Sequence, residues 1–278
     1  MNRRHAMKTT ALTTGLALLG QQNFAGVQKN NSKFKFSLNT STVSGQKPGI
    51  EKYIDIGARA GYDCLEVWIG DIKTYLTNGG SLRALKKLMD DSKITAENAI
   101  GFATWMTDDD EQRKAGFQQM REEMEIMAAL GCTRIAAPAA GVKNPNPDLF
   151  KVGERYKELL VLGRETGVTP QLEFWGASVF FHMGQALMAV AVANDPGARI
   201  LPDVYHLFRG ASGFESLKMI DGRLIDIIHM NDYPSTIPRE QMEDKDRIYP
   251  GDGVAPLKQI MADLKKLEGQ KILSLELF

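Results

Sequence analysis

Four side chains that could bind a divalent metal occur in the second half of the sequence, each directly after a short apolar run. They are Glu173, Asp203, His229 and Glu276. A charged group among apolar residues is costly to bury without a partner, and one cation shared by several such groups offsets that cost. The residue types therefore predict a metal site of three carboxylates and one imidazole, provided that the fold brings the four together.

This set of ligands also indicates which metal to expect. Carboxylate oxygens with one imidazole favour Mn²⁺ or Mg²⁺, with Co²⁺ or Zn²⁺ as substitutes. A structural zinc site would use cysteines and close its fourth position. The two cysteines, Cys64 and Cys132, lie in apolar segments without a CxxC motif, so we expect them to be small buried residues. We expect one divalent ion with positions open to water or substrate.

From Phe34 onward, apolar runs alternate with amphipathic stretches. The predicted strands are Phe34–Leu38, Asp63–Trp68, Ile94–Ile100, Thr133–Ala137, Thr169–Phe174, Arg199–Asp203, Leu224–Met230 and Lys271–Leu275. The predicted helices are Gly49–Ala60, Ser81–Asp91, Asp108–Leu130, Asp148–Thr166, Val179–Ala193, Phe214–Met219 and Val254–Leu267. This alternation predicts parallel βαβ units and an α/β fold, a (β/α)₈ TIM barrel over residues 31–278. The sequence ends at Phe278, before an eighth helix.

In such a barrel, polar residues at the carboxyl ends of strands face the active site. The four candidate ligands end four consecutive predicted strands, the fifth to the eighth. The strand map therefore places all four at one end of the barrel and at the same height.

Five short motifs make the prediction more specific: Leu172-Glu173-Phe174, Asp203-Val204-Tyr205-His206, His229-Met230-Asn231-Asp232, Pro250-Gly251-Asp252-Gly253 and Leu275-Glu276. Together they resemble the xylose isomerase-like TIM-barrel superfamily, in its branch of sugar phosphate isomerases and epimerases. The resemblance covers nearly all of residues 34–278. It implies the same four metal ligands.

The resemblance also implies roles in catalysis. Glu173 and Glu276 would form the proton-transfer pair, and His206 and Arg247 would bind the substrate, with Arg239 as the competing arginine. Such enzymes move a proton next to a carbonyl through an enediolate, with a base on the carbon and a cation at the oxygen. We therefore expect a metal-dependent sugar isomerase or epimerase.

The type of reaction stays open. If one glutamate carries out both proton transfers, the outcome is isomerisation, or elimination in which the enediolate loses a leaving group. The alternative function is a metal-dependent lyase or dehydratase of a keto-polyol or keto-glycoside.

Several other residues admit two interpretations. Trp175, next to Glu173, could stack on a sugar ring or pack at the rim, and it is a better candidate than Trp68 or Trp105. Asp232 could orient His229 or cap its own loop. Glu66, on the second predicted strand, matches a position that is commonly acidic in the family that the sequence resembles, but we interpret it as part of a barrel-core ion pair.

Composition bears on the partners. Lysine plus arginine and aspartate plus glutamate number 34 each, so the chain lacks the basic surplus typical of nucleic-acid enzymes. An apurinic endonuclease on this barrel would also need more ligands than these histidines supply. A non-catalytic sugar-binding module would not need both glutamates. We expect a small sugar or polyol as the substrate and no nucleic acid, and the sequence leaves homo-oligomerisation open.

The first residues differ from the rest. Arg3, Arg4 and Lys8 precede an apolar stretch from Ala11 to Leu19, followed by a polar tract. This order is typical of a secretory signal and resembles a twin-arginine signal, and the apolar stretch is too short to span a membrane. Residues 1–30 are therefore predicted to export the protein to the periplasm, with a cytoplasmic location as the alternative.

Overall fold

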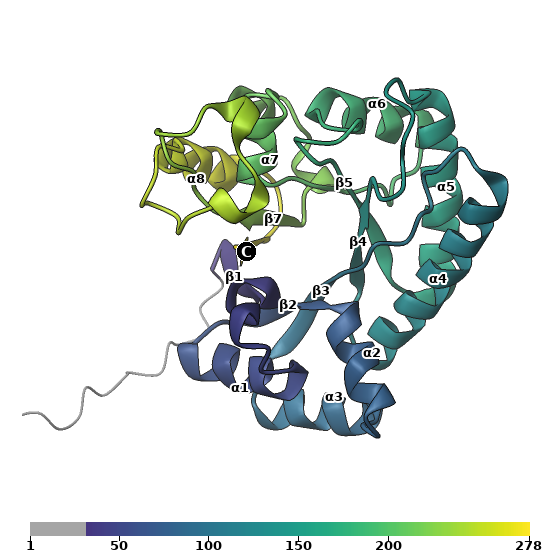
Figure 1. Cartoon of the computed structure of the whole chain (residues 1–278), viewed down its shortest axis with the longest axis vertical. Coiled ribbons are helices and arrows are strands. Elements are labelled where there is room, and N and C mark those ends of the chain that lie inside the picture. The colour runs from purple at the N-terminus through teal and green to yellow at the C-terminus, as the bar shows by residue number, and fades with distance from the viewer. Residues whose placement is uncertain (1–31) are drawn as a thin grey trace, which may run out of the picture. The chain divides into compact units, whose positions relative to one another are not determined.

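The computed structural model describes residues 32–278. The predicted export signal and leader, residues 1–30, lie outside these residues. Lys33–Phe278 form one compact unit, in which helices surround a ring of strands (Figure 1). Among residues 32–278, no helix combines the length and the apolar character needed to cross a bilayer.

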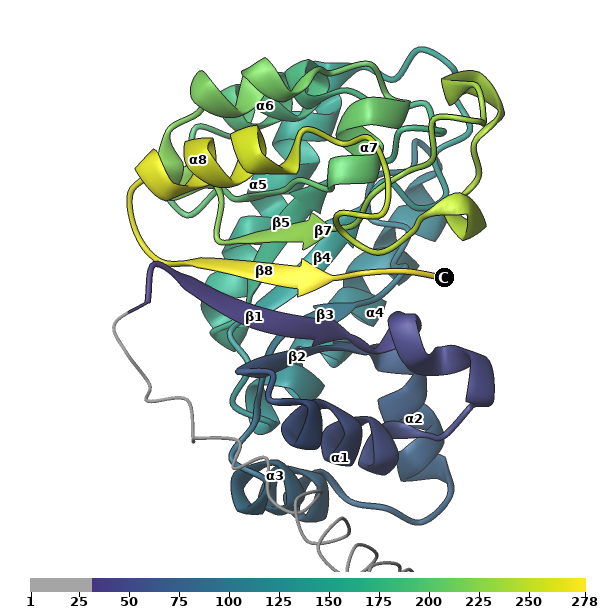
Figure 2. The ribbon, with the colours of Figure 1, turned by 90° about the vertical axis from the view of Figure 1, so that its left-hand side faces the viewer.

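Eight parallel strands form the inner ring. They are β1 Phe34–Asn39, β2 Cys64–Trp68, β3 Thr95–Ile100, β4 Arg134–Pro138, β5 Thr169–Glu173, β6 Ile200–Leu201, β7 Ile227–Met230 and β8 Lys271–Leu275. The last strand pairs with the first, Phe34 opposite Lys271 and Leu38 opposite Leu275. Figure 2 shows these two strands side by side and pointing the same way.

The strands fall into two ladders, β3-β2-β1-β8-β7 and β4-β5-β6. A single parallel bridge between Asp203 and His229 joins them, and the His229 amide donates to the Pro202 carbonyl at 2.9 Å. The predicted TIM barrel is therefore confirmed, with the two ladders meeting at two of the candidate ligands.

The helices pack outside this ring. They are α1 Ile50–Ala60, α2 Ile69–Thr77, α3 Leu82–Asp91, α4 Asp110–Ala129, α5 Leu149–Thr166, α6 Met183–Ala193, α7 Val204–Arg209 and α8 Leu257–Lys266. Polar N-caps fix several starts: Ser81, Asp109 and Asp148 accept hydrogen bonds from first-turn amides of α3, α4 and α5. Within residues 32–278 no helix follows β8.

The structure corrects some predicted elements. Helix α2 follows β2 without a loop, so no turn signal marks it, and Ile69 and Ile72 bury one face. Helix α6 begins at Met183 rather than Val179, because His182 caps it: its Nδ1 accepts from the Gly184 amide at 2.9 Å.

The elements predicted around β6 were also partly wrong. Strand β6 has two residues, and Asp203 caps α7, a helix that the sequence had not indicated. Phe214–Lys218 and Gly222–Leu224 are 3₁₀ helices, so β7 starts at Ile227 rather than Leu224.

Alternate residues of each strand face the barrel interior. A small apolar cluster fills one level of it: Cys64, Ile100, Ala136, Leu201, Ile227 and Ile272. The inward residues nearer the strand ends are polar and buried, among them Asn39, Glu66, Asn98 and Ser274. Both thiols are buried as predicted, and burial raises the pKa of Cys64 and of Cys132 to about 12.

The contact between α4 and the loop after β3 depends on a glycine. A Cβ at Gly116 would lie 2.6 Å from the Thr104 carbonyl carbon, whereas a Cβ at Gly70 of α2 would meet no atom within 4 Å. Gly116→Ala should lower the free energy of unfolding by about 1–3 kcal/mol, because backbone has to move. Gly70→Ala should leave it unchanged or raise it by up to about 1 kcal/mol. Urea titrations of both variants test this, and equal stability would contradict the packing described.

Candidate metal centre and active site

The four predicted ligands converge at the carboxyl ends of the strands. Glu173 ends β5, His229 lies in β7, Glu276 directly follows β8, and Asp203 lies two residues after the end of β6. All four are buried, with at most 4% exposure. The His229 Nδ1 atom lies 3.0 Å from a Glu276 oxygen and 3.5 Å from one oxygen each of Glu173 and Asp203.

Three of these residues have the spacing of metal ligands. One ligand atom each from Asp203, His229 and Glu276 lies within 4.8 Å of the others, a spacing that suits a shared cation. Glu173 is outside this tight group but faces the same imidazole nitrogen. The geometry therefore supplies three close donors and a fourth carboxylate beside them.

The two nitrogens of His229 have different surroundings. Nε2 lies 3.0 Å from Glu66 Oε1, and that carboxylate also accepts from Asn39, Asn98 and Ser274 at 2.9, 2.7 and 2.6 Å. A carboxylate so well supplied with donors accepts the Nε2 proton. Nδ1 therefore faces the other carboxylates and makes no aligned hydrogen bond, and a bound cation would take the place of its proton. An unpaired, buried nitrogen among carboxylates fits a metal ligand.

The electrostatics agree with this assignment. Burial, with help from the carboxylates of Glu276 and Asp203, raises the pKa of Glu173 to about 8. Burial alone would lower the pKa of His229, but the neighbouring Glu276 and Glu66 hold it well above its usual value. The raised pKa of Glu173 reports mainly its burial, whereas that of His229 reports the carboxylates around it, and a divalent cation would offset both effects.

Arg247 lies against the same carboxylates. One terminal nitrogen donates to Asp203 at 2.8 Å and to Glu276 at 2.6 Å, and the other donates to Asp244 at 2.8 Å. The guanidinium is buried and lies over the Phe278 ring, with its central carbon 4.9 Å from the ring centre. Arg239, the competing candidate, pairs instead with its neighbour Glu240, and its side chain is 42% exposed. The structure thus brings Arg247 to the site and not Arg239.

His206 lies one helical turn after Asp203, because Asp203 caps α7 by accepting from the His206 amide at 3.1 Å. Its Nδ1 accepts from the Gly176 amide at 3.2 Å, which ties α7 to the loop after β5. Burial lowers the pKa of His206 to about 4, so its ring is neutral near pH 7. The side chain is therefore a neutral group at the pocket wall.

Two residues of the His-Met-Asn-Asp motif hold the site in place. Asn231 donates to Asp203 at 3.1 Å and accepts from the Tyr205 amide at 2.9 Å. Asp232 accepts from three amides, those of Tyr233, Gly251 and Ala255. Of the two interpretations of Asp232, loop cap is correct. The sequence had assigned Asn231 no role, although it lies in a quoted motif.

A pocket of about 340 Å³ opens above these residues. Its lining residues are Trp68, Ile100, Phe102, Glu173, Trp175, Ala177, Ser178, His206, Asp244, Arg247, Glu276 and Phe278. Trp68 and Trp175 reach it, but Trp105 does not: Trp105 is fully buried, and its indole nitrogen donates to the Pro138 carbonyl at 2.9 Å. Trp105 is therefore a core residue.

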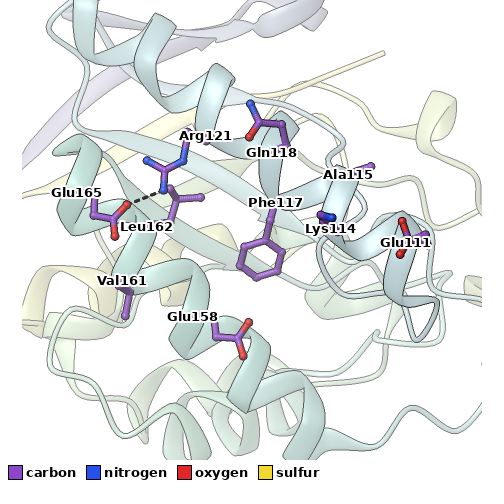
Figure 3. A pocket seen from close by; sticks show the side chains of 10 residues that line it. All are labelled: Glu111, Lys114, Ala115, Phe117, Gln118, Arg121, Glu158, Val161, Leu162 and Glu165. Carbon is purple, nitrogen blue, oxygen red and sulfur yellow. Dashed lines mark hydrogen bonds and ion pairs between the residues drawn. The ribbon is translucent and has the colours of Figure 1, made fainter.

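A larger depression, of about 580 Å³, lies outside the barrel between α4 and α5. Figure 3 shows Phe117 between the helices and Arg121 paired with Glu165, at 2.6 Å. Its side chains belong to outer helix faces and include none of the strand-end residues. The pocket above His229 is therefore the candidate active site.

Comparison with known proteins supports the fold and identifies the family of the chain. A family model of the xylose isomerase-like TIM barrel matches residues 54–278. The chain belongs to this family. A similar family member is an inosose isomerase of Bacillus velezensis, 25% identical over 251 residues and 88% of each chain. An inosose isomerase of Bacillus subtilis is 32% identical over 123 residues, so the match spans 44% of each chain.

Among solved structures of similar fold is one described as IOLI protein with a binding zinc atom. It superposes with a TM-score of 0.81 at 24% identity, covering 88% of this chain and 89% of that one. The barrel predicted from the sequence and its assignment to the family are thus confirmed.

The position of Glu66 leads to a testable expectation. Glu66→Gln should weaken the binding of Mn²⁺ by about 10- to 100-fold, because a neutral amide holds the Nε2 proton of His229 less strongly than a carboxylate does. Isothermal titration calorimetry on the chelator-treated protein measures this. Glu123→Gln is the matched control, since Glu123 is also buried but pairs with Lys73, away from His229. Equal affinities for all three proteins would contradict the orienting role.

Proposed function

We propose that this protein is a divalent-metal-dependent isomerase or epimerase of a sugar or sugar-like polyol. The observation that carries the proposal is the convergence of Glu173 and Glu276 on one imidazole nitrogen, His229 Nδ1, at the floor of a pocket. Proton transfer next to a carbonyl needs a carboxylate at the carbon and positive charge at the oxygen. The relatives described as inosose isomerases are consistent with such chemistry.

Asp203, His229, Glu276 and Glu173 would hold the metal. The mainly carboxylate donor set favours Mn²⁺ or Mg²⁺, and the zinc of the similar structure keeps Zn²⁺ among the candidates. When bound, the ion would polarise a substrate carbonyl and stabilise the negative charge that forms on its oxygen.

The side chains would divide the remaining work. Glu173 and Glu276 come from β5 and β8, which are separated around the barrel by β6 and β7. One glutamate could remove a proton and the other return one from a second direction, which is epimerisation. His206 and Arg247 would bind substrate hydroxyl or carbonyl groups, and Trp175 would pack against the sugar. Export to the periplasm, carried by residues 1–30, remains a separate proposal.

Hydrogen exchange tests the reaction directly. In deuterated water, the Mn²⁺-loaded protein should incorporate deuterium next to the carbonyl of one member of a panel of ketoses, inososes and keto-glycosides. Glu173→Gln and Glu276→Gln should each lower this rate by at least about 100-fold, because each removes a proton carrier. Glu240→Gln, an exposed glutamate in the loop after β7, should retain it.

Mass spectrometry and NMR of the products separate the outcomes. Exchange accompanied by loss of a substituent would assign the alternative, a lyase or dehydratase. Absence of exchange with every compound, with metal bound, would overturn the proposal.

A further inference from the structure

The candidate pocket has two different sides. One is polar and carries Glu173, Glu276, His206 and Arg247. The other is formed by Trp68, Phe102, Trp175 and Phe278, which we call the aromatic wall. These four residues come from the ends of β2, β3, β5 and β8, so the wall is assembled by the barrel and not by one loop.

The aromatic wall is continuous. Trp68 packs against Phe102 with ring centres 5.3 Å apart and against Phe278 at 6.1 Å, and Phe102 lies 6.1 Å from Trp175. Yet Phe102 is 45% exposed and Phe278 is 51% exposed. Large apolar rings that support one another and remain open to a pocket are suited to cover an apolar face of a ligand.

On the polar side, no cationic side chain among the lining residues that the structure describes is free to bind an anion. Arg247 is the one lysine or arginine among the residues that line the pocket, and it is engaged by Asp203, Glu276 and Asp244. A phosphate or carboxylate substrate needs free cationic groups or amides, as phosphate-binding proteins provide.

The usual place for a phosphate in this fold is also filled. TIM barrels often bind phosphate with the loops after strands seven and eight and a nearby helix start. Here the carboxylate of Asp232, just after β7, accepts the amides of Gly251 and Ala255 in the loop that leads to α8. A Cβ at Gly253 would lie 2.4 Å from an Asp232 oxygen, so this carboxylate is tightly enclosed.

From these contacts we infer that the pocket selects an uncharged, saturated ring. The C–H face of the ring would pack on the aromatic wall, while its carbonyl and hydroxyl edge meets the glutamates. Phosphorylated and open-chain sugars are poor ligands. This inference rests on the proposed function for the identity of the site, and it narrows the substrate to a cyclitol or to the sugar ring of a glycoside.

Equilibrium binding of unreactive ligands tests the inference. The Mn²⁺-loaded full chain is titrated with myo-inositol, D-sorbitol, methyl β-D-glucopyranoside and methyl β-D-glucopyranoside 6-phosphate, and tryptophan fluorescence reports binding near Trp68 and Trp175. Myo-inositol should bind at least about fivefold more tightly than sorbitol, its open-chain counterpart. The neutral glucoside should bind at least about tenfold more tightly than its phosphate. A preference between myo-inositol and the glucoside distinguishes the two ring sources.

Variants connect the preference to the aromatic wall. Phe102→Ala should reduce the ring-over-chain preference about fivefold, whereas Phe150→Ala, an exposed phenylalanine on α5, should leave it unchanged. Equal binding of ring and chain, or tighter binding of the phosphate, would overturn the inference. Because these ligands do not react, ring binding without deuterium exchange would leave the inference standing and remove the isomerase proposal. Exchange without a ring preference would do the reverse.

Discussion

The hydrogen bond between His229 Nε2 and Glu66, at 3.0 Å, is the contact on which the rest of the site depends. It fixes the proton on one nitrogen and aims the other at Glu173, Asp203 and Glu276. Without it the imidazole could rotate, and Nδ1 would no longer face the three carboxylates. Glu66 itself is held by three further donors from β1, β3 and β8.

Barrel closure makes this contact available. Glu66 lies on β2 and His229 on β7, and the pairing of β1 with β8 brings the two ends of the chain's fold together. The inward positions then alternate along each strand, so that β7 presents Ile227 to the apolar level and His229 to the polar one. In the same way, β8 presents Ile272 to the apolar level and Ser274 to the polar one. The strand register that fills the barrel core therefore also brings the polar residues of the site together.

Much of this was predictable from local patterns. Apolar runs of strand length that each end in a charged residue located His229 and its three carboxylate neighbours, because strand ends in a parallel barrel share one face. Glu66 was harder: its sequence context indicated a core ion pair but not which imidazole it would contact, since that depends on barrel closure. Helix α2 was missed, and the position of Trp105 was left open, because tertiary burial and not local sequence decides where an aromatic residue or a helix without a preceding loop packs. The role of Asp232 required the position of the Gly251–Ala255 turn.

The central claim is that His229 Nδ1, Asp203 and Glu276 together hold one divalent ion. Anomalous diffraction from a crystal of the Mn²⁺-loaded protein tests it most directly. The account predicts a single strong peak in the pocket, about 2.0–2.3 Å from His229 Nδ1 and from an oxygen of each carboxylate. A peak on the Glu66 side of the ring, or none within reach of His229 in a crystal soaked with excess Mn²⁺, would contradict it.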